Sequence, residues 1–109
     1  MILCHTIIPA ENPAKYGKPL NLLLVAENLA EETITAPVRL FGNDGSGWRE
    51  LLSEDRELPA HEHVHLYFQI PADRFEPGFW DGEEPEELEL LASETVPGPK
   101  EQGLLLFIQ

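Results

Sequence analysis

Three of the four histidines stand two residues apart, at His61, His63 and His65. On an extended strand, alternate side chains project from one face, roughly 7 Å from one to the next. Two imidazoles with a nearby carboxylate form a ligand set for Zn²⁺ or another divalent metal. The spacing therefore predicts a candidate metal site on one strand face. The alternative is a solvated strand face that holds no physiological metal.

Part of this stretch resembles the first metal-binding motif of cupins, H-x-H-x3-E, because His63-Val64-His65 is followed by Gln69. Gln69 replaces the carboxylate of that motif, and Glu57 stands where the motif has glycine. No histidine follows His65, so the second cupin motif is missing. The resemblance implies a cupin-like metal-binding protein. This function ranks below a binding or assembly module and below a carbohydrate-binding module.

Aromatic side chains form a second candidate site, made of Trp48, Tyr67, Phe79 and Trp80. Exposed aromatic rings beside Asp and Glu are able to stack on a sugar and bind its hydroxyl groups, which would make the chain a carbohydrate-binding module. The alternative is core packing or loop anchoring, since aromatic side chains bury large apolar areas.

Motifs for catalysis are missing from the sequence. It contains no G-x-S-x-G, no phosphate-binding loop and no dinucleotide fingerprint. Acidic residues are too abundant for a pair of carboxylates to be diagnostic. We therefore expect a protein that is not an enzyme and that uses no cofactor.

The net charge of the chain limits the classes of partner that we expect it to bind. The 109 residues contain 20 acids and 7 bases, which give a formal net charge of −13. Nucleic acid and anionic membranes are unfavourable partners for such a chain, because both recruit clustered Lys and Arg. The acids between Glu76 and Glu94 predict a solvated loop, with Ca²⁺ binding or a basic protein partner as the alternatives.

The compartment is predicted from the single cysteine and from the first residues. Cys4 has no partner for an internal disulfide, and its apolar surroundings predict a buried thiol. The start of the chain is too short and uncharged for a secretion signal, and no apolar run reaches the length of a membrane span. These features predict a cytoplasmic protein, or an extracellular one if the chain is a piece of a larger secreted protein.

Alternation of apolar and polar residues, punctuated by 10 prolines and 8 glycines, predicts a single all-β domain over residues 1–109. The expected strands are 1–8, 20–27, 34–41, 58–70, 88–95 and 104–108. Residues 48–55 predict either a seventh strand or a helical turn. No segment is long enough for helical crossovers, so an antiparallel β-sandwich is favoured over a parallel sheet.

Two of these strands are apolar on both faces. Leu23 and Val25 add a second apolar face to 20–27, while Leu105 and Phe107 do so for 104–108. Either these faces are covered within the chain or they meet a partner. They predict an interface, and with it a binding or assembly module that self-associates or docks onto another protein. A terminal strand this apolar is also expected to be paired inside a sheet.

The run PLNLLLVAENLAEETITAPVRLFGNDG resembles strands B and C of bacterial immunoglobulin-like domains of the CARDB type. Leu58-Pro59-Ala60-His61-Glu62 is similar to the segment before strand E in the same families, and BsuPI-type proteinase inhibitors share some of these features. The last third of the chain departs from the CARDB pattern. The resemblance implies an immunoglobulin-like sandwich of about seven strands and a non-enzymatic role.

Overall fold

A computed structural model describes residues 2–109, so the part of the first predicted strand that falls on Met1 lies outside the described residues. The fold consists of seven strands and two short 3-10 helices. The strands are β1 (Ile2–Pro9), β2 (Leu20–Asn28), β3 (Ile34–Asn43), β4 (Trp48–Leu58), β5 (His63–Ile70), β6 (Glu87–Ser93) and β7 (Leu104–Phe107), and the helices are η1 (Ala72–Phe75) and η2 (Pro77–Trp80).

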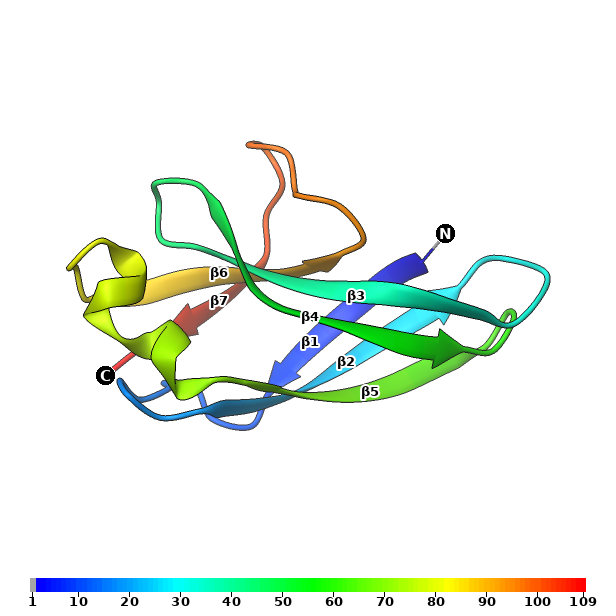
Figure 1. The fold of residues 1–109 in the computed structure, drawn as a ribbon, viewed down its shortest axis with the longest axis horizontal. Helices are drawn as coiled ribbons and strands as arrows, with labels where there is room; N and C mark the ends of the chain where they lie inside the picture. The colour runs from blue at the N-terminus through cyan, green and yellow to red at the C-terminus, as the bar shows by residue number, and fades with distance from the viewer. Residues whose placement is uncertain (1) are drawn as a thin grey trace.

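The strands form two antiparallel sheets that pack face to face (Figure 1). One sheet has three strands in the order β1-β2-β5, and the other has four in the order β4-β3-β6-β7. The predicted all-β antiparallel sandwich is confirmed. Within the described residues, no helix is long and apolar enough to cross a membrane.

The core lies between the sheets and is filled by the inward-facing half of each strand. From β2 it takes Leu20, Leu22, Leu24 and Ala26, each at most 3% exposed. Leu88 and Leu90 of β6 lie in the same cluster. Burial of one leucine side chain contributes about 2 kcal/mol, so the alternation in β2 fixes which face is inside.

The segment 48–70 differs from the expectation. Residues 48–55 belong to a long strand, β4, which continues to Leu58. The predicted strand 58–70 is therefore divided, because the turn at 59–62 separates β4 from β5. A β-bulge next to Leu40 and Phe41 shifts the pairing of β3 with β4, which interrupts the two-residue period of β4.

Terminal strand β7 belongs to the four-stranded sheet, as its edge strand. One edge pairs with β6. The other edge meets the connection between β1 and β2, where the Asn12 side chain accepts a hydrogen bond from Phe107 N at 3.0 Å. Ala14 N donates to Phe107 O at 2.7 Å. The connection thus covers an edge that would otherwise invite aggregation.

A buried asparagine ties the two sheets together at one end. Asn28, at the end of β2, is 0% exposed. Its Nδ2 donates to Leu58 O at 3.0 Å and to Glu32 O at 2.9 Å, while its Oδ1 accepts from Ala30 N at 2.9 Å. The side chain therefore joins the turn after β2 to the end of β4.

Candidate functional site

The outer face of the three-stranded sheet is the surface with the most distinctive chemistry. Antiparallel register places outward side chains of β1, β2 and β5 in rows across the sheet. One row contains Ile8, Leu23 and Tyr67, since Leu23 pairs with both of the others. We call this set the apolar row.

The apolar row is open to solvent. Ile8 is 52% exposed and Tyr67 is 70% exposed, whereas Leu23 between them is half-buried. Val25 lies in the next row on the same face, paired with Thr6 and His65. A contiguous exposed apolar surface of this kind marks an interaction site more often than scattered apolar residues do.

A polar cluster stands on the same face. The Nε2 atoms of His5 and His63 each lie 3.1 Å from Oε1 of Glu27. The two imidazole rings are 4.8 Å apart between centroids and meet edge to face. One side chain comes from each strand, because His5 belongs to β1, Glu27 to β2 and His63 to β5.

The backbone brings this cluster together through two features. Glu27 pairs directly with His63 in the antiparallel register of β2 and β5. On the other side, Cys4 pairs with Ala26 and Thr6 pairs with Val25, so His5 is the extra residue of a β-bulge in β1. The bulge turns its imidazole toward Glu27 and reverses the alternation that follows, which places Ile7 inside and Ile8 outside.

Only one of the three predicted metal-binding histidines joins this cluster. His63 does, whereas His65 lies opposite Val25 and His61 lies in the turn before β5 with a φ of 55°. His5 and Glu27 were not among the predicted ligands. Glu27 has the parity of the outward residues Leu23 and Val25, which was a usable signal, but the bulge that presents His5 leaves no mark in the sequence.

The four predicted ligand-binding aromatics do not share a surface. Trp80 is 1% exposed, its Nε1 donates to Arg74 O at 2.7 Å, and Phe79 packs edge to face against it. Trp48 lies on β4 and donates to Gly98 O at 3.2 Å. Tyr67 belongs to the other sheet. Trp80 is thus a core residue, and the set forms no stacking platform.

The predicted interface residues divide between two sheets. Leu23 and Val25 face outward on β2, next to Tyr67 and the histidines. Leu105 and Phe107 are 42% and 46% exposed on β7, in the four-stranded sheet. All four are accessible to some degree, but they cannot form one continuous patch.

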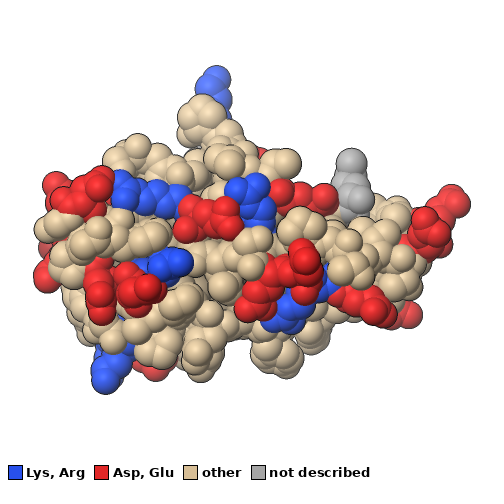
Figure 2. Space-filling model, in the orientation of Figure 1, with Lys and Arg blue, Asp and Glu red and all other residues tan. Residues whose placement is uncertain are grey.

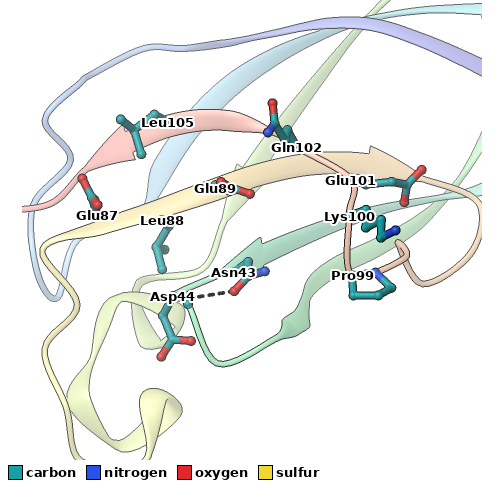
Figure 3. A pocket seen from close by; sticks show the side chains of 11 residues that line it. Asn43, Asp44, Glu87, Leu88, Glu89, Pro99, Lys100, Glu101, Gln102 and Leu105 are labelled. Carbon is teal, nitrogen blue, oxygen red and sulfur yellow. Dashed lines mark hydrogen bonds between the residues drawn. The ribbon is translucent and has the colours of Figure 1, made fainter.

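A hollow of about 480 Å³ lies between the β3–β4 turn, β6 and the segment before β7 (Figure 3). Its charged lining residues are Asp44, Glu87, Glu89, Lys100 and Glu101. Two of its lining oxygens have partners in the turn: Asn43 Oδ1 accepts from Gly45 N at 2.8 Å, and Asp44 Oδ1 accepts from Ser46 N at 3.0 Å. Partial burial opposes ionisation of Asp44, but hydrogen bonds from Ser46 keep its pKa below the usual value.

Acidic side chains gather at the two ends of the molecule, over the segment that follows η2 and over the β2–β3 turn (Figure 2). Between them, on the side shown, acids and bases are interspersed. Several bases are paired, such as Arg39 with Glu50 at 2.8 Å and Arg56 with Glu54 at 2.7 Å. On the side shown, acidic side chains without neighbouring bases are therefore found mainly at the two ends.

Cys4 lies beneath the outer face, on the inward side of β1, and is half-buried. Burial, together with the nearby charge of Glu94, raises the pKa of its thiol to about 11. At neutral pH the sulfur stays protonated, so it is a poor nucleophile and a poor metal ligand.

Comparison with known proteins gives a fold and no family. No protein-family model matches the chain, and no curated protein matches it either. Among solved structures, the chain is similar to part of a β-glucosidase involved in saponin metabolism from intestinal bacteria, with a TM-score of 0.72 and 13% identity over 100% of this chain and 16% of that one.

A β-glucosidase from Erythrobacter marinus matches with a TM-score of 0.69 and 14% identity, over 100% of this chain and 15% of that one. A β-glucosidase from Listeria innocua in complex with gluconolactone matches at 0.67 and 11%, over 99% and 16%. Identities this low show the fold alone. The chain spans only 15 to 16% of the solved chains it matches, so this sandwich also occurs as a small part of much larger proteins.

Proposed function

We propose that the chain is a non-catalytic binding module that docks onto another protein through the outer face of its three-stranded sheet. One observation carries the proposal. Glu27 is the only Asp, Glu, Lys or Arg in β1, β2 and β5, in a chain that has 20 acids and 7 bases. On this face the apolar and aromatic side chains stand among polar ones such as Thr6, Asn21 and Gln69. Depletion of charged residues is characteristic of the core of an interface.

The apolar row supplies the anchor of this surface. Tyr67 presents a large ring with a polar tip, and aromatic residues of this type are enriched among interface hot spots. Leu23 lies next to it and Ile8 beyond Leu23, so the row crosses the sheet. Covering these side chains removes apolar surface from water, at about 25 cal/mol for each Å².

The occupant we infer is a larger protein domain with an apolar, weakly charged surface, not a second copy of the chain. Three strands at about 4.8 Å spacing and eight residues at about 3.3 Å each give a face of roughly 400 Å². The total buried area of about 800 Å² lies below that of stable complexes but within the range of contacts between domains. Two copies would also each carry a charge of −13 and repel one another.

Two likenesses support the same proposal. The β-glucosidase chains combine a sandwich of this fold with a much larger remainder, so the fold is compatible with a position beside a bigger domain. The sequence resemblance to bacterial immunoglobulin-like domains implies a role without catalysis. Neither identifies the partner.

Matched leucine variants test the proposal. The tagged chain is isolated from its native host as wild type, as Leu23→Asp and as Leu105→Asp, which place the same new charge on the two different sheets. We expect one stoichiometric protein companion to be retained by wild type and Leu105→Asp, lost from Leu23→Asp, and bound again when companion and chain are purified separately. A companion lost only from Leu105→Asp, or the absence of any companion, would contradict the proposal.

Sedimentation velocity of the purified chain completes the test. We expect a monomer over the accessible concentration range. A dimer that Leu23→Asp dissociates would show that the face binds a second copy, which would overturn the inferred occupant.

A further inference from the structure

We propose that His5, Glu27 and His63 together bind one divalent metal ion of the borderline class, with Zn²⁺ the best match. Each imidazole would supply Nε2 and Glu27 a carboxylate oxygen. Two histidines and one carboxylate are a ligand set found in catalytic zinc sites, where a further position remains open to solvent. The proposed site requires no docked partner, so it stands apart from the proposed function.

The ligand atoms are already near their required places. They all lie within 4.8 Å of one another, and each histidine nitrogen is 3.1 Å from the carboxylate oxygen. Ligands at 2.0–2.1 Å from a tetrahedral ion are separated by roughly 3.4 Å. The His5 and His63 side chains are partly exposed, so rotation of their rings would close the remaining gap while the sheet holds their backbones.

The contacts and the charge of Glu27 favour a cation at this cluster. Glu27 Oε1 lies within hydrogen-bonding distance of both imidazoles, so one carboxylate oxygen holds two rings together. A metal ion replaces these two contacts once each ring carries its proton on Nδ1, the tautomer required of a neutral ligand. The carboxylate is also the only formal charge of the three strands, which focuses attraction for a cation on this point.

The donor chemistry selects the class of metal. Two nitrogen ligands disfavour Mg²⁺ and Ca²⁺, which prefer oxygen, and favour Zn²⁺, Ni²⁺ or Cu²⁺. Cys4 is adjacent in sequence but faces the inside of the sandwich, on the other side of the strand from the outward His5. The thiol therefore does not take part in the site.

Metal binding at this position would clamp the sheet. The three ligands come from three neighbouring strands, and β1 is an edge strand that pairs only with β2. An ion that binds the folded chain more tightly than the unfolded one stabilises it by mass action. Zn²⁺ should therefore raise the unfolding temperature of the chain.

The test uses untagged protein, Zn²⁺ alone as the probe and four single variants. In calorimetric titration we expect one Zn²⁺ per chain for wild type, and a loss of affinity of about tenfold or more for His5→Gln and Glu27→Gln. His61→Gln and His65→Gln remove histidines outside the cluster and should bind as wild type does. Circular dichroism checks that each variant is folded.

Histidine ring signals in NMR spectra provide a second readout. On addition of Zn²⁺, the signals of His5 and His63 should shift together, while those of His61 and His65 stay in place. Absence of stoichiometric binding by wild type, or an equal loss of affinity in all four variants, would overturn the proposal.

Discussion

The two outer faces of this sandwich meet the surroundings in different ways. The strands of the three-stranded sheet contain one charged residue, Glu27, and its face is open. The strands of the four-stranded sheet contain nine, namely Arg39, Arg49, Glu50, Glu54, Asp55, Arg56, Glu57, Glu87 and Glu89. The connection between β6 and β7 is held to this second sheet by hydrogen bonds from Arg39 Nη1 to Glu94 O and from Trp48 Nε1 to Gly98 O.

Phe41 shows how the covering works. It pairs with Glu50 and Leu91 and does not belong to the core cluster, yet it is only 1% exposed. The Arg39 guanidinium lies 4.9 Å from the centre of its ring. An aromatic ring on one outer face is thus sheltered within the chain, whereas Tyr67 on the other stays exposed. Within the described residues, the ring of Tyr67 has no such cover.

Alanine at these two aromatic positions gives the largest expected contrast. Phe41→Ala should lower the free energy of unfolding by about 3–4 kcal/mol, because it removes a buried ring. Tyr67→Ala should cost less than about 1 kcal/mol in the isolated chain, because its ring is exposed. Urea unfolding followed by tryptophan fluorescence measures both. A similar cost for the two variants would remove the distinction between the faces.

Two asparagines on β2 allow the link between the sheets to be compared with the open face: Asn28 makes the link, and Asn21 lies on the open face. Asn28→Ala should cost about 2–3 kcal/mol, since it leaves the buried carbonyl of Leu58 and the partly buried amide of Ala30 without the partners they have now. Asn21→Ala removes an exposed contact with Gln69 at 3.1 Å and should cost under about 0.5 kcal/mol. Equal losses of unfolding free energy for the two variants in denaturant titrations would show that the hydrogen bonds of Asn28 have no special structural role.

A substitution at Trp48 tests how residues 94–103, the connection between β6 and β7, are held to the four-stranded sheet. Trp48→Phe deletes the hydrogen bond from Nε1 to Gly98 O and should cost about 1 kcal/mol. Hydrogen exchange should become faster at the amides of residues 94–103 and stay unchanged in β5. Tyr67→Phe is the control on the open face, where no change in exchange at 94–103 is expected.

The last prediction concerns the thiol of Cys4, just beneath the open face, and is measured as reactivity and not as a change in stability. Because burial raises the pKa of its thiol to about 11, the folded chain at pH 8 should react with Ellman's reagent roughly 100-fold more slowly than a thiol of pKa 9. The neutral thiol favours the folded state below about pH 9, and this contribution is lost as the pH rises toward 11. Native reactivity equal to that of the urea-unfolded chain would contradict this placement.

Sequence reasoning predicted most of the fold because alternation survives wherever one strand face is buried. In β2 and β5 the inward residues follow a two-residue period without interruption. β2 lies where it was expected, whereas β5 covers only the second part of the expected strand 58–70. For β4 the sequence left a strand and a helical turn as alternatives, because Leu51 and Leu52 are adjacent apolar residues at a bulge. A bulge adds one residue to a strand, so it breaks the very period on which the prediction depends.

The candidate site was predicted only in part, for the same reason. The histidines at 63 and 65 share one outer face, as alternation requires. Which of them finds a ligand partner depends on the pairing between distant strands, and that pairing includes the bulge at His5. Of the two alternatives for the aromatics, core packing holds for Trp80, because η1 and η2 fold it into the core although Pro77 and Gly78 before it suggest an exposed loop.

Photo-cross-linking from two exposed aromatic positions tests the central claim, that the open face docks onto another protein. The photoreactive amino acid p-benzoylphenylalanine replaces Tyr67 on the open face or Phe107 on the four-stranded sheet, which are both exposed. We predict a single cross-linked protein from position 67 in the native host and none from position 107. A cross-link from position 107 alone, or from position 67 only to a second copy of the chain, would contradict this account.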